Sequence, residues 1–273
     1  MPLSRVPPLQ RSLGQHHLRH PGSAIPAVDF LDVAGRRVIE IGAGGGALTR
    51  LLLERGASRV IACELDLLWT LELRRRIDDP RLVPVTADGC DLRYERASAS
   101  TRIAGNLPYN AATRIILAVL ERAAVGVRSA FLVQREVADR LTASPGESEY
   151  GGLSVLVAAR ASARRLAIVR PGSFVPPPAV TSAFVGFERT APPVDEAEWS
   201  GFANFVRMAF GQRRKTLVNN FRPSVGRAAA EAVLSALDLP STARAESLGV
   251  SEFVELFRLL RSQIRSSPDC TRF

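Results

Sequence analysis

The chain has little of several residue types, and each scarcity excludes a class of protein. Lysine occurs once among 273 residues, at Lys215, and cysteine three times, at Cys63, Cys90 and Cys270. The cysteines lack the paired spacing of a disulfide framework or a zinc site, so we expect reduced thiols and no metal. No apolar run approaches the ~20 residues of a membrane span, and the N-terminus lacks the apolar stretch of a secretion signal. These absences predict a cytoplasmic protein without a membrane segment.

Positive charge is abundant despite the lack of lysine. The net charge is +9, and arginine carries nearly all of the positive side. A GC-rich coding bias explains a high ratio of arginine to lysine, but it does not explain the positive sum. Arginine's planar guanidinium suits phosphate contacts and base stacking better than an ammonium group does. The charge therefore favours a polyanionic partner.

Strand-like and helix-like segments alternate from about residue 36 to residue 135, which predicts parallel βαβ units. Composition then shifts at Thr190–Pro193, a predicted linker, and the pattern beyond it is helical. We expect an α/β domain at 1–190 and a small all-helical domain at 191–273. The expected strands are 37–41, 59–64, 82–86, 101–105, 129–133, 163–169 and 182–188. The expected helices are 47–55, 67–77, 111–124, 135–141, 195–210, 214–221, 227–237 and 251–264.

The motif Asn106-Leu107-Pro108-Tyr109 follows the fourth expected strand. Pro108 ends that strand because it removes a backbone donor and fixes φ. The Asn106 amide oxygen and the Pro108 carbonyl can accept the two N–H groups of an aromatic amine and draw its lone pair out of conjugation. Tyr109 can stack on the base that carries the amine. Such a motif alone often does no more than end a strand, so its position in the sheet decides its interpretation.

Three earlier strand ends support that interpretation. Glycines follow the first strand, where they let the backbone approach a ligand, although dehydrogenases carry a related loop. Glu64 ends the second strand, where an acid can hold both ribose hydroxyls, and Asp88 ends the third. Either acid alone is more often a solvated strand end or a helix cap. Together with Asn106 they favour S-adenosylmethionine. The residues expected around this donor are Gly42, Ala43, Gly44, Gly46, Glu64, Leu65, Asp88, Gly89 and Asn106.

These motifs together resemble those of the rRNA adenine N6-dimethyltransferases, from about Leu13 to Phe221. Their fold is a Rossmann-like S-adenosylmethionine-dependent methyltransferase sheet, here with a small all-helical C-terminal domain. The chain is most similar to the branch that dimethylates two adjacent adenines in the 3′-terminal hairpin of small-subunit (16S) rRNA. The further segments that carry the resemblance are Leu13–Leu18, Gln134–Leu141, Tyr150–Val155, Phe174–Val180 and Phe210–Thr216.

The resemblance implies roles for residues in these segments. Phe174 is implied to stack on the flipped target base. His16 stands where the family has an asparagine that touches the donor, and Leu18 follows it; His16-His17 in place of Asn-Phe is the clear departure from the family. Contacts to rRNA phosphates are expected from Arg213, Arg214 and Lys215. Arg135 and Arg140 either extend that surface or are simply exposed charges.

The resemblance also implies a monomer that acts on small-subunit rRNA or a 30S precursor in ribosome biogenesis. Two alternatives are open. A macrolide-resistance methyltransferase of large-subunit (23S) rRNA typically has Asn-Ile-Pro-Tyr and lacks the motif at 210–216. A non-catalytic rRNA-binding assembly factor has no need of an intact Asn106–Tyr109 motif.

Overall fold

A computed structural model of the chain describes Pro7 and residues 16–262. Two compact units are present: Met1–Asp139 with Ala161–Thr190, and Arg140–Arg160 with Ala191–Phe273. The predicted domains met at residue 190. In the structure the chain passes from the first unit to the second after Thr190, and Arg140–Arg160 groups with the second unit. The expectations for Leu13–Gln15, Cys270 and the end of the last helix lie outside the described residues. Within those residues, no helix is long and apolar enough to cross a membrane.

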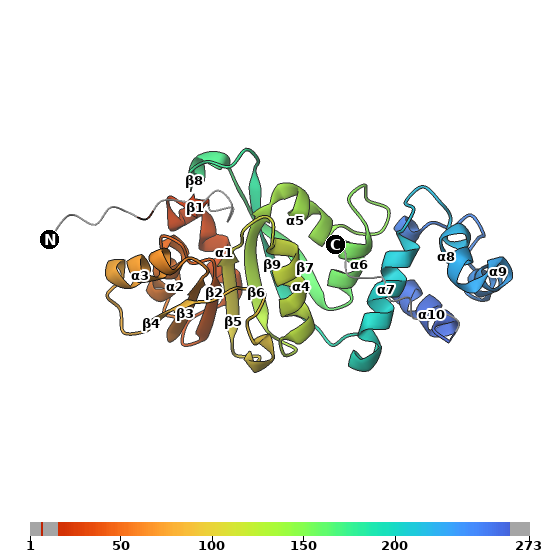
Figure 1. The fold of residues 1–273 in the computed structure, drawn as a ribbon, viewed down its shortest axis with the longest axis horizontal. Coiled ribbons are helices and arrows are strands. Elements are labelled where there is room, and N and C mark those ends of the chain that lie inside the picture. The colour runs from red at the N-terminus through yellow and green to blue at the C-terminus, as the bar shows by residue number, and fades with distance from the viewer. Residues whose placement is uncertain (1–6, 8–15, 263–273) are drawn as a thin grey trace. The chain divides into compact units, whose positions relative to one another are not determined.

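The first unit is built on a seven-stranded sheet (Figure 1). Its first five strands in spatial order are parallel, and the last two run antiparallel to their neighbours. In spatial order the strands are β4 (Leu82–Thr86), β3 (Arg59–Glu64), β2 (Arg37–Ile41), β5 (Arg102–Asn106), β6 (Arg128–Gln134), β9 (Ser182–Arg189) and β7 (Ala161–Val169). The parallel order follows from the alternation of strands and helices along the chain, and it brings the carboxyl ends of β2 to β5 to one edge.

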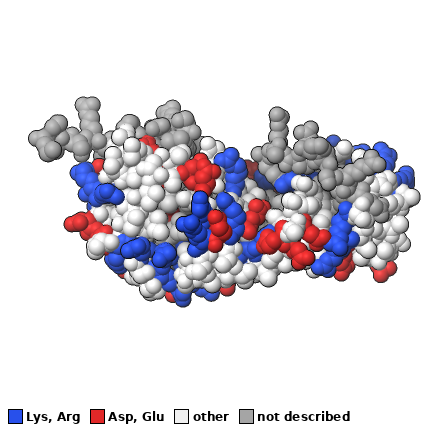
Figure 2. Space-filling view, turned by 60° about the horizontal axis from the view of Figure 1, so that its bottom comes forward, with Lys and Arg blue, Asp and Glu red and all other residues white. Residues whose placement is uncertain are grey.

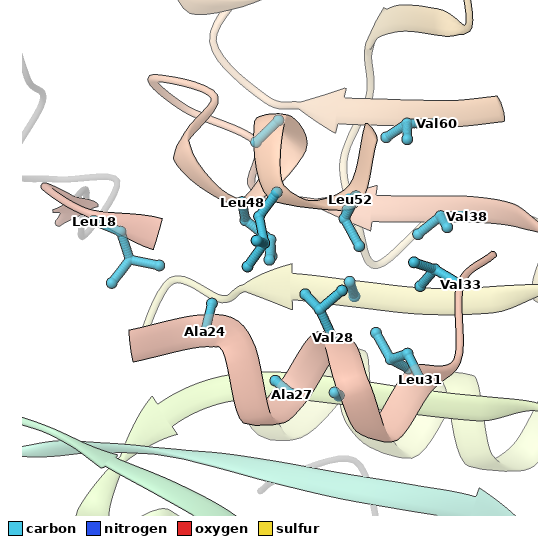
Figure 3. Packing of buried hydrophobic residues seen from close by; sticks show 14 of the residues in the cluster. Leu18, Ala24, Ala27, Val28, Leu31, Val33, Val38, Leu48, Leu52 and Val60 are labelled. Carbon is cyan, nitrogen blue, oxygen red and sulfur yellow. The ribbon is translucent and has the colours of Figure 1, made fainter. Parts of the chain in front are cut away.

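Helices cover both faces of this sheet because side chains alternate along each strand. Val38 of β2 faces a core that includes side chains of α1 (Ile25–Leu31) and α2 (Ala47–Glu54). Figure 3 shows these apolar side chains filling the space between α1 and the strands. Ile41 faces the opposite side, near Ile115 of α4 (Ala112–Arg122). Full burial of one leucine in such a core contributes roughly 1.5–3 kcal/mol.

Two short elements of the first unit were not expected from the sequence. Helix α1 has seven residues with a proline in its first turn and no side-chain cap, so its sequence carries little helical signal. The ribbon of β1 (His17–Leu18) and β8 (Phe174–Val175) pairs segments more than 150 positions apart. A strand of two residues is too short to show an alternating pattern of apolar and polar residues, so the sequence does not reveal this pairing. The ribbon positions His16 and His17 beside the sheet edge that carries the strand ends.

The second unit is helical. Its elements are α6 (Gly152–Ala158), α7 (Trp199–Ala209), α8 (Leu217–Val225), α9 (Arg227–Ala236) and α10 (Val250–Leu260), while α5 (Arg135–Thr142) spans the division between the units. Buried aromatic rings form its core, with Phe205 and Phe221 stacked at 5.0 Å between centroids.

Contacts made by two of its residues explain why Arg140–Arg160 belongs to this unit. Buried Arg160 makes a bidentate pair with Glu196 and lies 3.8 Å from the ring centroid of Trp199. The Tyr150 hydroxyl donates to the Leu248 carbonyl at 2.7 Å. The helices expected from the sequence do not include α6, because polar and glycine-rich residues precede it.

Candidate active site

The carboxyl ends of β2, β3, β4 and β5 surround a cavity of about 200 Å³. Parallel strands place their carboxyl ends at one sheet edge, so the residues that follow them in the sequence meet there. Of the residues singled out from the sequence, those that line this cavity are His16, Gly42, Glu64, Leu65, Asp88, Gly89, Asn106, Leu107, Pro108 and Tyr109. Both acids, the first glycine and the Asn-Leu-Pro-Tyr motif are therefore gathered in one place.

The glycine loop after β2 makes two close approaches. Gly42 has a φ of 73°, and a Cβ there would lie 2.5 Å from the backbone oxygen of Asn106. Gly44 has a φ of 47°, and a Cβ there would lie 2.7 Å from the His17 Nε2. Only glycine tolerates both the left-handed backbone and the lack of space. The loop is thereby held against the end of β5 on one side and the β1 segment on the other.

The remaining donor-site candidates divide into two groups. Ala43, Gly44 and Leu18 line a smaller recess of about 20 Å³ beside the main cavity. Gly46 lines neither space: it is the N-cap of α2, and a Cβ there would collide with Leu73 and Ile77. A glycine is required at position 46 because the helix packs closely against Leu73 and Ile77. The sequence pattern of the loop does not distinguish this packing requirement from contact with a ligand.

The two acids are held by backbone N–H groups. Buried Glu64 accepts hydrogen bonds from Gly44 N at 2.9 Å and Asp66 N at 3.1 Å. Burial raises the pKa of Glu64, and the backbone N–H donors act against that rise. Asp88 accepts from Cys90 N at 2.8 Å, an Asx-turn that fixes its carboxylate at the cavity rim.

The Asn-Leu-Pro-Tyr motif is fixed by neighbours on three sides. Asn106 Nδ2 donates to the His16 carbonyl at 2.7 Å, which leaves Oδ1 as the acceptor of that amide. The Pro108 carbonyl accepts from Ala111 N at 3.0 Å and keeps its second lone pair. The Tyr109 hydroxyl lies 2.8 Å from Ser182 Oγ, which holds the ring in place, and burial raises its pKa.

A carboxylic acid that sequence reading did not assign to the site lies directly behind the glycine loop. Glu40, one residue before the end of β2, is 1% exposed and lines the smaller recess. Its Oε2 accepts from Thr49 Oγ1 at 2.7 Å, whereas Oε1 has no hydrogen-bond partner among the described residues. Burial raises the pKa of Glu40 to about 8. The sequence signal for Glu40 was a carboxylic acid within an otherwise apolar strand.

Replacing Glu40 with glutamine is expected to flatten the dependence of stability on pH. The pKa of Glu40 in the folded protein is raised above the ordinary value of 4.5, so the stability contributed by this proton is complete below about pH 4.5 and is lost as the pH rises toward about 8. Between about pH 5.5 and about pH 8 this loss amounts to about 3 kcal/mol, so the wild-type Tm should fall about 6–12 °C more than that of Glu40→Gln. Scanning calorimetry at the two pH values measures this, and parallel curves would contradict a buried neutral acid.

Three further residues line the cavity that were not chosen for the site from the sequence: Arg114, Asn110 and His17. Arg114 is on the first turn of α4 and donates to Cys90 Sγ at 3.0 Å. The His17 ring packs edge-on against Trp69 at 4.3 Å between centroids, and burial lowers its pKa to about 4. The position of α4 directly after the motif is the only sequence signal for Arg114.

Phe174 does not reach the cavity in this arrangement. It is 1% exposed, lies opposite Leu18 in the β1–β8 ribbon and belongs to the apolar core of the first unit. The ribbon turns its ring toward that core. The expected stacking of Phe174 on a target base stays a prediction. The five cationic residues expected to contact RNA, Arg135, Arg140, Arg213, Arg214 and Lys215, are all exposed.

The fold and this cavity define a Rossmann-like methyltransferase. The sheet order, the glycine loop, the rim acids and the amide–proline–aromatic motif occur together in that class. Within the described residues, no group of three or more His, Cys, Asp or Glu could hold a metal ion.

Comparison with known proteins identifies the family. The model of the family described as "Ribosomal RNA adenine dimethylase" matches residues 8–262. A "Ribosomal RNA small subunit methyltransferase A" from Gluconobacter oxydans is 39% identical over 256 residues, covering 92% of this chain and 82% of the relative. One of the same name from Xanthomonas oryzae pv. oryzae is 37% identical over 253 residues, covering 91% and 95%. The chain therefore belongs to the ribosomal RNA adenine dimethylase family.

Solved structures share the fold. A dimethyladenosine transferase from Plasmodium falciparum superposes with a TM-score of 0.78 at 22% identity, covering 91% of this chain and 98% of the other. The 23S rRNA methyltransferase ErmE superposes with a TM-score of 0.69 at 22% identity, covering 89% and 99%. The Rossmann-like sheet and the helical C-terminal region predicted from the sequence are thereby confirmed.

Proposed function

We propose that this protein transfers methyl groups from S-adenosylmethionine to the N6 atoms of two adjacent adenines in the 3′-terminal hairpin of small-subunit (16S) rRNA, during ribosome maturation. The observation that carries the proposal is the single cavity in which the glycine loop and both rim acids lie beside Asn106, Pro108 and Tyr109. The relatives that share 37–39% of its sequence bear the name of a small-subunit rRNA methyltransferase.

The residues at the cavity fit a nucleoside methyl donor. Gly42 and Gly44 leave backbone surface open where a Cβ would intrude. Glu64 and Asp88 place carboxylates at the ends of neighbouring strands, where they can accept from ribose hydroxyls and from an adenine amino group. When bound, the donor supplies an electrophilic methyl group on a sulfonium. The chain's own contribution is to position this donor and the acceptor amine.

Catalysis rests on orientation of the amine. Asn106 Oδ1 and the second lone pair of the Pro108 carbonyl accept the two N6–H groups, which draws the nitrogen lone pair out of conjugation with the ring. That lone pair forms the new N–C bond while the C–S electron pair leaves with sulfur. The cationic amine then loses a proton to water, so no general base is needed. Monomethyladenine keeps one N–H, which permits a second transfer after rotation.

The proposal is tested by the choice of substrate. Purified protein with labelled donor should methylate small ribosomal subunits from cells that lack this gene, and should leave large subunits unlabelled. Mapping the modified nucleotides should find dimethyladenosine at two adjacent positions. Label in the large subunit would favour the macrolide-resistance activity. Binding to small subunits without any turnover would favour a non-catalytic assembly factor.

We also propose that exposed cations of the second unit bind rRNA phosphates. Arg213 Nε lies 3.7 Å from Glu246 Oε2. Neither Arg214 nor Lys215 has an ion-pair partner among the described residues. Basic and acidic side chains are interspersed on the face shown in Figure 2. We therefore expect phosphate binding to depend more on a few cations without an acidic neighbour than on the net charge of the chain. The +9 net charge supports a polyanionic partner in general.

Neutralising these cations should reduce the salt dependence of RNA binding. Each of Arg214→Ala and Lys215→Ala is expected to lower the slope of log K against log salt by about 1, because one phosphate contact fewer releases fewer counterions. Fluorescence anisotropy with labelled small-subunit rRNA measures the slope. Arg227→Ala is the matched control, since Arg227 is exposed but paired with Glu231 at 2.8 Å. Slopes equal to that of the wild type would exclude the contact.

We propose that the enzyme acts as a monomer, as the family resemblance implies. We place this enzyme in the cytoplasm, where ribosomal subunits mature.

A further inference from the structure

A short turn carries Asp88, the acid proposed to meet the adenine of the methyl donor. The turn follows β4, which stands at the end of the strand order with β3 as its neighbour. Within the turn, Asp88 Oδ1 accepts from Cys90 N at 2.8 Å, and the Asp88 carbonyl accepts from Asp91 N at 3.1 Å. Because the Cys90 N–H aims the carboxylate, the position of Cys90 decides where the second oxygen of Asp88 points.

Helix α4 holds Cys90 through two arginines. Arg114 Nη2, from the first turn of the helix, donates to Cys90 Sγ at 3.0 Å. Arg122 Nη2, from the last turn, donates to the Cys90 carbonyl at 3.1 Å. Hydrogen bonds from a charged donor are stronger than those between neutral groups. Both the side chain and the backbone of Cys90 are therefore fixed by one helix.

Other side chains enclose the same turn. A Cβ on Gly89 would lie 2.6 Å from Ile41 Cγ2 and 3.1 Å from Ile115 Cδ1, so the turn lies directly on side chains of β2 and α4. The buried Tyr94 hydroxyl donates to the Gly89 carbonyl. The Arg122 guanidinium lies over the Tyr94 ring, at 5.1 Å from its centroid. The turn is thereby packed against α4, and Cys90 is the residue through which both arginines act on it.

Arg114 binds sulfur although two carboxylates are near. Its pKa is raised chiefly by the hydrogen bond to Cys90, and to a smaller extent by the charges of Asp88 and Asp91. Arg114 is exposed, lines the cavity and forms no ion pair among the described residues. Because its guanidinium is directed at Cys90, it does not occupy the Asp88 carboxylate. Asp88 Oδ2 can therefore accept a hydrogen bond from a ligand.

We propose that Cys90 and Arg114 are positioning residues that aim the Asp88 carboxylate at the 6-amino group of the donor's adenine. This inference rests on the proposed function, because it takes S-adenosylmethionine as the donor. It deepens that function by naming the residues that set the preference for adenine over another base in the donor. It also makes α4, which follows the Asn106–Tyr109 motif in the chain, a connection between the motif and the donor end of the cavity.

A change of base in the ligand tests this role. S-Inosylhomocysteine carries an oxygen in place of the 6-amino group, so it presents an acceptor where Asp88 needs a donor. Calorimetric titration should show that wild type binds S-adenosylhomocysteine at least about tenfold more tightly, as expected for a hydrogen bond to a charged acceptor. Cys90→Ala and Arg114→Ala should each reduce this ratio to about threefold or less, by weakening the adenosyl ligand alone.

A conservative variant and a control accompany these two. Cys90→Ser keeps an acceptor for Arg114, so its ratio of affinities should stay within about threefold of the wild-type ratio. Arg96→Ala is the matched control, because Arg96 is exposed, follows the same turn in the chain and does not line the cavity. Its affinities for both ligands should equal those of the wild type.

Two further measurements show whether Arg114 acts through Asp88. In an Asp88→Ala background, adding Arg114→Ala should change the affinity for S-adenosylhomocysteine by less than about twofold, since the residue that it positions is gone. In steady-state assays of Cys90→Ala and Arg114→Ala, KM for the donor should rise while kcat stays within about threefold of wild type, because the catalytic motif is unchanged.

Three results would overturn the inference. Equal losses of affinity for both ligands in Cys90→Ala would mean that this residue only supports the fold. Weaker binding of both ligands in Arg114→Ala, with none in Cys90→Ala, would mean that Arg114 touches the donor itself. A wild type that binds both ligands equally would show that Asp88 does not recognise the amino group, even if small subunits are methylated. Discrimination between the ligands without methylation of small subunits would instead contradict the proposed function alone.

Discussion

Asn106→Ala should lower the rate of methyl transfer by about two to three orders of magnitude, the usual cost of removing one preorganised electrostatic contact. The amide is the only side-chain acceptor that the motif offers to the amine, and the Pro108 carbonyl already accepts from Ala111 N. Without it, the N6 lone pair stays conjugated with the adenine ring and is a poor nucleophile. Single-turnover assays with saturating donor and small subunits measure the chemical step.

Binding measurements separate this effect from misfolding. Glu64 and Asp88 are untouched in Asn106→Ala, so the variant should still bind S-adenosylmethionine; its affinity should fall by no more than about tenfold, the loss of the single contact expected between Asn106 and the donor. Asn106→Asp keeps an acceptor oxygen but loses the N–H that donates to the His16 carbonyl. Its rate should lie between those of alanine and wild type. Wild-type turnover by Asn106→Ala would refute the proposed role of the amide.

Gly42→Ala should abolish donor binding and lower thermal stability. The added Cβ would lie 2.5 Å from the Asn106 carbonyl oxygen, which belongs to the backbone of β5 and cannot rotate away. The φ of 73° adds a strain of order 1–3 kcal/mol for a residue other than glycine. Relief requires the loop to move away from β5, and the cavity loses its shape. Calorimetric titration and a thermal melt measure the two effects.

Gly35→Ala separates the strain from the collision. Gly35 has a φ of 70°, but a Cβ there would meet nothing within 4 Å. The variant therefore carries the same backbone strain without the contact to Asn106, and it lies outside the cavity. It should lose stability and keep its affinity for the donor. Equal donor affinities in the two variants would show that the approach of Gly42 to Asn106 does not shape the site.

Local patterns predicted most of the sheet and most of the cavity. Strands β2, β3 and β4 were predicted with the bounds observed, since each is a short apolar run between polar or glycine residues. The four strand ends were expected at one edge because parallel order follows from the alternation of strands and helices. This expectation needs no distances, and in the structure Glu64, Asp88 and Asn106 do line one cavity.

Contacts between distant segments were beyond such patterns. Nothing in two residues such as His17 and Leu18 reveals that they pair with Phe174 and Val175. The pairing nevertheless decides which aromatic ring faces the cavity and which is buried. Arg140–Arg160 shows the same limit, because buried Arg160 and Tyr150 tie a loop-like sequence to the C-terminal helices. Gly46 fits the ligand-loop pattern, yet its neighbours show a packing role.

The approach of Gly42 to the Asn106 carbonyl has a consequence for how sequences in this family can vary. The turn at Gly42 belongs to the part of the cavity proposed for the donor, and the turn at Asn106 to the part proposed for the base. Only a hydrogen atom fits between Gly42 Cα and the Asn106 carbonyl oxygen. A side chain at the first turn would have to be matched by a shift of the second. Evolution should therefore alter the two turns jointly or leave both alone, while the surrounding loops diverge freely.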